Sequence, residues 1–392
     1  MLFAAGVFQF ATYACFFNLT PLYPEVGRDL HLDAGELGSL VGVGGIASVL
    51  VQVPGGSGGD RWGRRPFFVL AMALLTCSQI ARWQASQPAM LLLAQILGGA
   101  AQGIATVNAW ALVADATQSN SGRQGRAFGI LNASLALGLV AGYLVAGAVG
   151  GLIGWQSMSV VLAGVPLMAL AALAWIPRGR PSLAGVRPGL ATVLRSVAHP
   201  RRLALTLMAA LTLAAGQGAL YVLPFAVQQR DLGEFAAALL LVPYVVGSVV
   251  AGPLGGAFSD RFGSSRVIFW LLSVGVLACC ALVWGAASSL ILILCFVLIG
   301  ASVNGTLPLF AVRIVGLGDP TGVGAGSIMA GLRVGQSTGT FLGPAIAGLV
   351  LAHGGLNLAW VAQAGGLAAT LALHQSAPLL QHVHARRIGP RQ

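Results

Sequence analysis

Twelve runs of apolar residues, each about as long as a bilayer is thick, limit what this chain can fold into. They cover about residues 2–22, 37–57, 67–84, 89–114, 127–150, 154–176, 203–226, 235–257, 267–287, 289–312, 325–351 and 357–375. A helix needs roughly 20 apolar residues to cross the hydrocarbon core. Only 8% of the residues are charged, whereas soluble domains carry about 25%. The sequence therefore predicts an all-α membrane protein with twelve transmembrane helices.

The arginines indicate how these helices are oriented. With both termini in the cytoplasm, 17 of the 21 basic residues fall in cytoplasmic segments. Arg28, Arg82 and Arg230 fall on the far side, and Arg333 lies inside a span. Cytoplasmic loops of membrane proteins carry an excess of basic residues. We therefore expect a multi-pass protein of the cell (inner) membrane with cytoplasmic termini, and we attribute the net charge of +11 to topology rather than to nucleic-acid binding.

The two halves of the chain repeat each other. Between the second and third spans lie Gly56, Asp60, Arg61, Gly63, Arg64 and Arg65, and 200 residues later lie Gly256, Asp260, Arg261 and Gly263. In the fifth and eleventh spans, Gly138, Gly142 and Gly147 correspond to Gly339, Gly343 and Gly348 at an offset of 201. Duplicated bundles are frequent in transporters. We expect an N-terminal six-helix bundle at 1–176, a cytoplasmic linker at 177–202, a second bundle at 203–378 and a cytoplasmic tail at 379–392.

The segment 56–65, together with its second copy, resembles the signature loop of the major facilitator superfamily. The resemblance covers essentially the whole chain. It implies two pseudo-symmetric six-helix bundles around a central cavity that opens alternately to each side of the membrane. It also implies a monomer whose partners are the lipid bilayer and a small-molecule substrate.

The same resemblance assigns a cytoplasmic gate to the residues of both loop copies. In the first copy, Asp60 at a helix boundary can accept hydrogen bonds from free backbone N–H groups and pair with nearby arginines. By resemblance, this loop joins the two bundles when the cytoplasmic side is closed, and Asp115 pairs with a neighbouring loop. The alternatives are a purely topological role for the loop charges and a solvated helix end for Asp115.

The glycines of the fifth span resemble a motif of the family's exporters, which usually carries Gly-Pro. Here Tyr143 replaces the proline, although Gly343 and Pro344 restore the pair in the second half. Small residues at such spacing also let helices pack closely, so general helix packing is the alternative. The family's proton-coupled exporters tend to carry an arginine in the fourth span, and residues 95–103 contain none.

Arg333 is the one ionisable residue deep inside a predicted span. Such a residue normally faces the bundle interior or a water-filled cavity. Gln336, Ser337 and Thr340 follow it at i+3, i+4 and i+7, so the four side chains share one helical face. We expect this face to line the substrate cavity, with a structural arginine as the alternative. Further cavity candidates are polar residues in predicted spans, namely Tyr13, Asn18, Gln102, Thr106, Asn108, Asn132, Gln217 and Asn304.

Three functions remain open from the sequence. The first is a secondary active exporter of small organic molecules, and the second is an importer or exchanger of a small anionic solute bound at Arg333. The third is a non-transporting membrane sensor or scaffold. The sequence contains no GxSxG, Walker or HExxH motif, so we expect no enzyme activity, catalytic residue, cofactor or metal, and leave coupling to a proton or another ion open.

Overall fold

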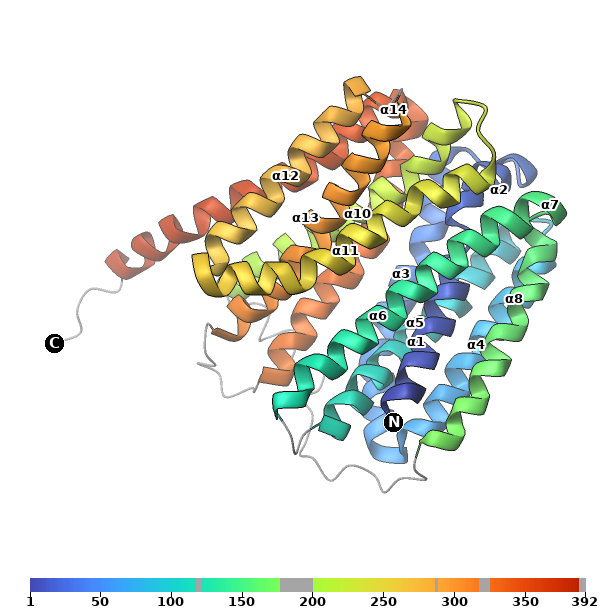
Figure 1. The fold of residues 1–392 in the computed structure, drawn as a ribbon, viewed down its shortest axis with the longest axis horizontal. Coiled ribbons are helices and arrows are strands. Elements are labelled where there is room, and N and C mark those ends of the chain that lie inside the picture. The colour runs from blue at the N-terminus through green and yellow to red at the C-terminus, as the bar shows by residue number, and fades with distance from the viewer. Residues whose placement is uncertain (118–120, 177–199, 286–287, 317–324, 388–392) are drawn as a thin grey trace.

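The computed structural model is all-helical and describes residues 1–117, 121–176, 200–285, 288–316 and 325–387. In the first half the helices are α1 (Leu2–Phe16), η1 (Thr20–Leu22), α2 (Tyr23–Asp29), α3 (Ala34–Trp62), α4 (Arg64–Trp83), α5 (Pro88–Thr117), α6 (Ser121–Val145), η2 (Ala146–Gly150), α7 (Gly151–Ile153), α8 (Trp155–Ala169) and η3 (Leu170–Trp175). In the second half they are α10 (Pro200–Gln228), α11 (Glu234–Phe262), α12 (Ser264–Gly285), α13 (Ser289–Gly316) and α14 (Ala325–Arg387). Figure 1 shows α1–α8 and α10–α14 as two bundles side by side.

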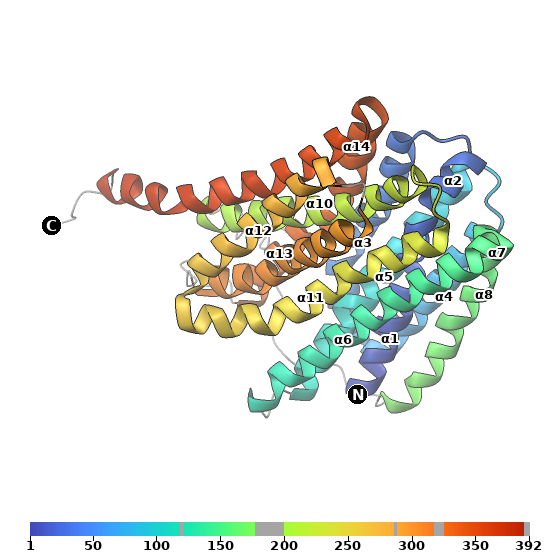
Figure 2. The same cartoon turned by 45° about the horizontal axis from the view of Figure 1, so that its top comes forward.

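The helix count agrees with twelve spans once α14 is divided. Eleven stretches of the described chain are long and apolar enough to cross a membrane, and the last one, Leu332–Ser376, has 45 residues. A continuous helix of that length would measure about 68 Å, twice the roughly 30 Å hydrocarbon core. Gly355 interrupts it with φ 72°, and the chain turns back on itself there (Figure 2). The stretch therefore contains the eleventh and twelfth spans.

The internal repeat is present in the backbone as well as in the sequence. The glycines with positive φ in the described residues are Gly63, Gly154, Gly263 and Gly355. They form two pairs, because Gly263 follows Gly63 by 200 residues and Gly355 follows Gly154 by 201. The first pair separates the second span of each half from the third, and the second pair separates the fifth from the sixth. Both halves therefore turn at equivalent positions, as expected for a duplicated six-helix unit.

The outer surface of the bundles suits a lipid environment. Large apolar side chains stand exposed on it, including Leu152 at 85%, Trp284 at 84% and Met168 at 78%. Water would make such a surface unfavourable, whereas lipid tails are as apolar as the side chains themselves. The helices are accordingly apolar toward lipid as well as toward the core.

Three segments differ from the predicted boundaries. The first span, expected over 2–22, ends as an α-helix at Phe16 and continues after a break as the 3-10 turn η1. The segment 56–65, expected as a loop, is helical except at Gly63, because α3 runs on to Trp62 and α4 begins at Arg64. Asp60 therefore lies in the last turn of α3 rather than at a positive helix end. In the predicted tail, α14 remains helical to Arg387, and residues 177–199 of the predicted linker lie outside the described part.

The two bundles contact each other toward one end of the molecule. We call the end that carries Arg61, Arg64, Arg261 and Arg266 the basic end, and the opposite end, where α2 lies, the α2 end. At the α2 end, Gly38 lies directly against the backbone of α14, and Gly147 lies against the first turn of α11. The Tyr221 hydroxyl on α10 donates a 2.6 Å hydrogen bond to the carbonyl oxygen of Ala34 on α3. The α2 end is therefore closed in this conformation.

Candidate transport site

The polar face of α14 lies against the first bundle. The guanidinium carbon of Arg333 lies 4.5 Å from the ring centre of Trp110 on α5, and Arg333 donates a 3.1 Å hydrogen bond to Gln336. The Trp110 ring is itself stacked on Phe128 at a centroid distance of 5.0 Å. Arg333 is nevertheless exposed. An exposed side chain that faces the other bundle lies in a space between the bundles that water can reach.

A chain of hydrogen bonds continues from α14 across the first bundle. The Gln52 amide donates to Ser337 at 3.0 Å and to Ser48 at 3.1 Å. Ser48 donates to Gln102 at 2.5 Å, and Gln102 donates to the Tyr13 hydroxyl at 3.2 Å. These neutral groups connect α14, α3, α5 and α1 through the middle of the membrane. They offer donors and acceptors to a solute without placing a charge there.

Toward the α2 end the space narrows to a small cavity with aromatic walls. Rings of both bundles line it together with two amides: Phe16, Phe17, Tyr23, Gln95, Tyr143, Gln217 and Tyr221. Thr340 and Pro344 of α14 complete the wall. Its volume of about 20 Å³ is room for about one water molecule. An organic solute therefore has no room among these residues in this conformation.

The second bundle has a polar group that mirrors Ser48 and Gln102. Asn304 on α13 donates to Ser248 at 2.8 Å and to the Tyr244 hydroxyl at 3.2 Å, both on α11. Asn304 is half-buried, so part of its side chain remains accessible. Asn132 on α6, the repeat counterpart of Arg333, is exposed, and the Thr106 hydroxyl donates to Gln9 at 3.4 Å.

Two predicted cavity residues lie elsewhere. Asn18 and Asn108 are both fully buried. Asn108 donates to the carbonyl oxygens of Gly55 and Ile104 at 3.1 and 2.9 Å, so it joins α5 to α3. The Asn18 side-chain oxygen accepts a 2.6 Å hydrogen bond from Arg82. Both amides serve helix packing, because their hydrogen bonds are made inside the first bundle.

Arg82 is the largest departure from the sequence prediction, which placed it on the far side of the membrane, near the end of the span 67–84. Its side chain is fully buried near the end of α4. It donates to the carbonyl oxygens of Cys15 at 2.8 Å and Phe16 at 3.2 Å, and to Gln95 at 3.0 Å. Carbonyl groups at a helix C-terminus attract cations. Arg82 therefore stabilises the break after α1 and fixes Gln95, which lines the aromatic cavity.

The gate residues of the first repeat form an ion cluster within one bundle. Arg64, with a side chain only 7% exposed, bonds to Asp60 at 3.0 Å and to Asp115 at 2.6 Å. Asp115 thus pairs across helices, from α5 to α4. In the second repeat Asp260 and Arg261 are exposed, and Ser264 replaces the arginine. Arg61 is exposed and Arg65 half-buried, and within the described residues neither forms an ion pair with the second bundle.

The predicted packing glycines make close helix contacts of two kinds. Gly138 and Gly142 lie against the backbone of α1, and their counterparts Gly339 and Gly343 lie against that of α10. These contacts are inside a bundle. Gly147, in contrast, lies against α11, and its counterpart Gly348 lies against α3, so the third glycine of each set packs one bundle on the other.

The sequence prediction missed Ser48, Gln52, Trp110 and Arg82 as members of this region. Ser48 and Gln52 are four residues apart in an apolar run, a spacing that places them on one helical face and was available as a signal. Trp110 carried none, because a tryptophan in an apolar run is equally consistent with a lipid-facing position. Among the described residues, no group of three or more His, Cys, Asp or Glu side chains lies close enough to hold a metal ion.

Comparisons with known proteins agree with this architecture. A profile of the Major Facilitator Superfamily matches residues 5–327. The quinolone resistance protein NorA of Staphylococcus aureus is 24% identical over 122 residues, which is 31% of each chain. An uncharacterized 38 kDa protein of Thermoproteus tenax is 29% identical over 276 residues, 67% of this chain and 66% of that protein.

Solved structures resemble the fold over nearly the whole chain. A point mutant of the nucleoside transporter NupG has a TM-score of 0.82 at 14% identity, and the match covers 96% of this chain and 99% of that one. A bacterial homolog of the human lysosomal transporter Spinster has a TM-score of 0.80 at 17% identity, and the match covers 96% of each chain.

Proposed function

The chain belongs to the Major Facilitator Superfamily of secondary transporters, and from this premise we propose that it exports small organic molecules from the cytoplasm by alternating access. It is a multi-pass membrane protein rather than an enzyme. What carries the proposal is the composition of the space between the bundles. Aromatic rings, amides and hydroxyls line it, with Arg333 as its cation. Such a lining suits a partly apolar organic solute that is held by a few polar groups.

The proposed direction of transport has two supports. The partial similarity to NorA, a quinolone resistance protein, favours efflux. The distribution of arginines favours a cytoplasmic position for the basic end, and in that orientation a cavity closed at the α2 end would receive its solute from inside the cell. In the proposed cycle the basic end then closes, and Asp60, Arg61 and Arg65 would engage the second bundle as a gate. We propose that the monomer is the working unit.

Survival of an efflux-deficient bacterial host against a broad panel of toxic compounds tests this proposal. Expression of the chain should protect the host against some compounds, and Asp60→Asn should abolish that protection because it removes the charge that binds Arg64. Asp231→Asn changes an exposed residue before α11; it is the matched control and should protect as well as the unmodified chain. Lack of protection by protein shown to be in the membrane would refute broad efflux.

A second function is favoured by Arg333 itself. No aspartate or glutamate among the described residues forms an ion pair with it, and it faces the other bundle over Trp110. A fixed cation in a site of low dielectric attracts an anionic group. Uptake or exchange of a small organic anion is therefore the alternative.

Transport of radiolabelled aromatic carboxylates into proteoliposomes would separate the two functions. If the anion is the substrate, Arg333→Gln should abolish uptake and Arg333→Lys should retain part of it. A non-transporting sensor or scaffold would tolerate both Arg333→Gln and Asp60→Asn without a change in phenotype.

A further inference from the structure

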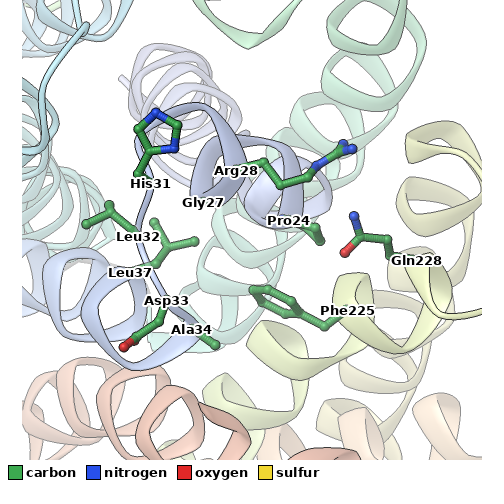
Figure 3. Close-up of a pocket in the computed structure, with 10 residues that line it drawn as sticks. All are labelled: Pro24, Gly27, Arg28, His31, Leu32, Asp33, Ala34, Leu37, Phe225 and Gln228. Atoms are coloured by element: carbon green, nitrogen blue, oxygen red, sulfur yellow. The ribbon is translucent and has the colours of Figure 1, made fainter.

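A second pocket opens on the surface of the α2 end (Figure 3). Its volume is about 450 Å³, within the range of about 300–1,000 Å³ that small-molecule sites occupy. One wall comes from α2, the link to α3 and the start of α3, with Arg28, His31 and Leu37. The other wall comes from the last turns of α10 in the second bundle, with Phe225 and Gln228. We call this site the outer pocket; it is separate from the aromatic cavity.

The first wall is held in a fixed shape by local hydrogen bonds. At the end of α2, the backbone N–H of His31 donates to Arg28 and that of Leu32 donates to Gly27. This is the Schellman arrangement, in which the residue at the position of His31 adopts a left-handed conformation and is usually glycine. His31 adopts it with φ 53°, although this conformation is unfavourable for a residue with a side chain. The strained residue carries its imidazole to the mouth of the pocket.

Asp33, the acidic residue in the pocket lining, already forms hydrogen bonds within the fold. The Asp33 carboxylate accepts the backbone N–H of Glu36 at 2.8 Å, and the Glu36 carboxylate accepts that of Asp33 at 3.0 Å. This capping box begins α3 and uses the charge of Asp33 at a helix N-terminus.

The remaining groups favour an anion with an apolar body. Arg28 is exposed and forms no ion pair with the other described residues. Its guanidinium and the Gln228 amide lie on the same side of the pocket, while the Phe225 ring and Leu37 form the apolar part (Figure 3). A carboxylate or similar group can accept hydrogen bonds from the guanidinium, and an aromatic or branched body can cover Phe225.

We infer that the outer pocket binds an amphipathic organic monoanion and that its occupancy holds the two bundles together at the α2 end. The second part rests on the alternating access proposed above. Directly below the pocket, the ring of Tyr221 lies 5.4 Å from Phe225 and 5.2 Å from Tyr23, and its hydroxyl bonds to Ala34. Opening the α2 end breaks the contacts of Tyr221 with Tyr23 and Ala34 and separates the two walls. A ligand that needs both walls therefore favours the closed conformation.

Thermal unfolding of the purified full chain in a neutral detergent tests the binding. The probe is 1-naphthoate, and uncharged 1-naphthamide is its control for partitioning into the detergent. Naphthoate should raise the unfolding midpoint, naphthamide should not, and Arg28→Gln should weaken the naphthoate effect at least tenfold in concentration. Phe225→Ala should weaken it similarly. Both variants change residues that are not fully buried, so their midpoints without ligand verify that they fold.

Arg333→Gln distinguishes the outer pocket from the central site. Its naphthoate response should equal that of the unmodified chain, because Arg333 lies at the opposite half of the span. No response of the unmodified chain, an equal response to naphthamide, or an effect that Arg28→Gln retains and Arg333→Gln loses would overturn the assignment. The readout needs no turnover, so a failure to find an exported compound would refute the proposed function and leave the binding result intact.

Cysteine labelling tests the conformational effect. With Cys77→Ser to remove an exposed thiol, a membrane-impermeant maleimide should label Ser337→Cys from the basic end. Naphthoate should accelerate this labelling several-fold, since it favours the conformation closed at the α2 end. Tyr221→Phe, which removes the bond to Ala34, should reduce the acceleration. Slower labelling with naphthoate would show that the occupied pocket favours the other conformation and would refute this part.

Discussion

Replacement of Arg82 by leucine removes a buried cation whose role in the fold follows directly from its contacts. Its guanidinium donates four hydrogen bonds, to Cys15, Phe16, Asn18 and Gln95. The Cys15 carbonyl keeps a second donor, because the Gln79 amide also binds it at 2.8 Å. Leucine fills part of the volume but donates nothing. The acceptors on Phe16, Asn18 and Gln95 then lose the donor that the structure gives them.

The magnitude follows from these three acceptors. Each buried polar group left without its partner costs about 1–3 kcal/mol. Replacing the arginine also removes the cost of desolvating a buried cation, which offsets part of the loss from the three acceptors. The net loss in the free energy of unfolding is then roughly 3–5 kcal/mol. A change of 1 kcal/mol moves the unfolding midpoint of a large domain by about 2 °C, so Arg82→Leu should lower it by roughly 6–10 °C. Arg82→Lys retains a charge and up to three donors, and it should recover about half of that loss.

Thermal unfolding of the purified chain in detergent, followed by tryptophan fluorescence, measures the effect. Arg266→Gln is the matched control, because Arg266 is exposed on α12, and its midpoint should stay within about 1 °C of the unmodified chain. A midpoint for Arg82→Leu equal to that of the control would refute the reasoning. It would mean that water or another side chain satisfies the end of α1 equally well.

Three further predictions concern the contacts between and within the bundles. Gly38→Val should abolish transport while leaving membrane insertion intact, because the valine side chain would overlap the backbone of α14 and keep the α2 end from closing. Accelerated maleimide labelling from the α2 side would verify this. Normal transport by the variant would contradict it. Asp115→Asn should lower stability by about 1 kcal/mol in thermal unfolding, since its partner Arg64 retains Asp60; a loss as large as for a fully buried pair would contradict the geometry. Trp110→Leu should raise KM for an anionic substrate about fivefold, the equivalent of about 1 kcal/mol of cation–π stabilisation at Arg333; an unchanged KM would show that the ring does not position the cation.

The fold was predictable because hydrophobicity alone determines which segments enter a bilayer. The position of the Arg333 side chain between the bundles was predictable for the same reason, since an arginine deep in an apolar run normally faces the bundle interior or a water-filled cavity. Arg82 was not, because an arginine near a span end is expected to reach the interface. Only the contact with the broken end of α1 reveals its role, and the break itself has no clear signal in residues 16–20.

The faces of the helices were harder to predict than the helices. In a soluble helix the polar side marks the solvent, but here lipid and core are both apolar. Asn18 and Asn108 were therefore indistinguishable in sequence from Gln102 and Gln217, although the first two bond inside a bundle and the last two face the space between bundles. The outer pocket was out of reach for a different reason, since it forms only where α2 and α10 meet.

The glycine contacts between the bundles bear on how fast the protein can change conformation. Where Gly147 meets α11 and Gly348 meets α3, backbone lies close to backbone, so no long side chains interlock at these two points. The two bundles can then move past each other at these points without a change in side-chain rotamers. The activation barrier for opening the α2 end should accordingly arise from discrete side-chain contacts across it, among them the Tyr221–Ala34 hydrogen bond and the Tyr221–Tyr23 ring contact. A chemical change at the Tyr221 side chain should therefore alter the turnover rate while the bundles themselves remain as stable as before.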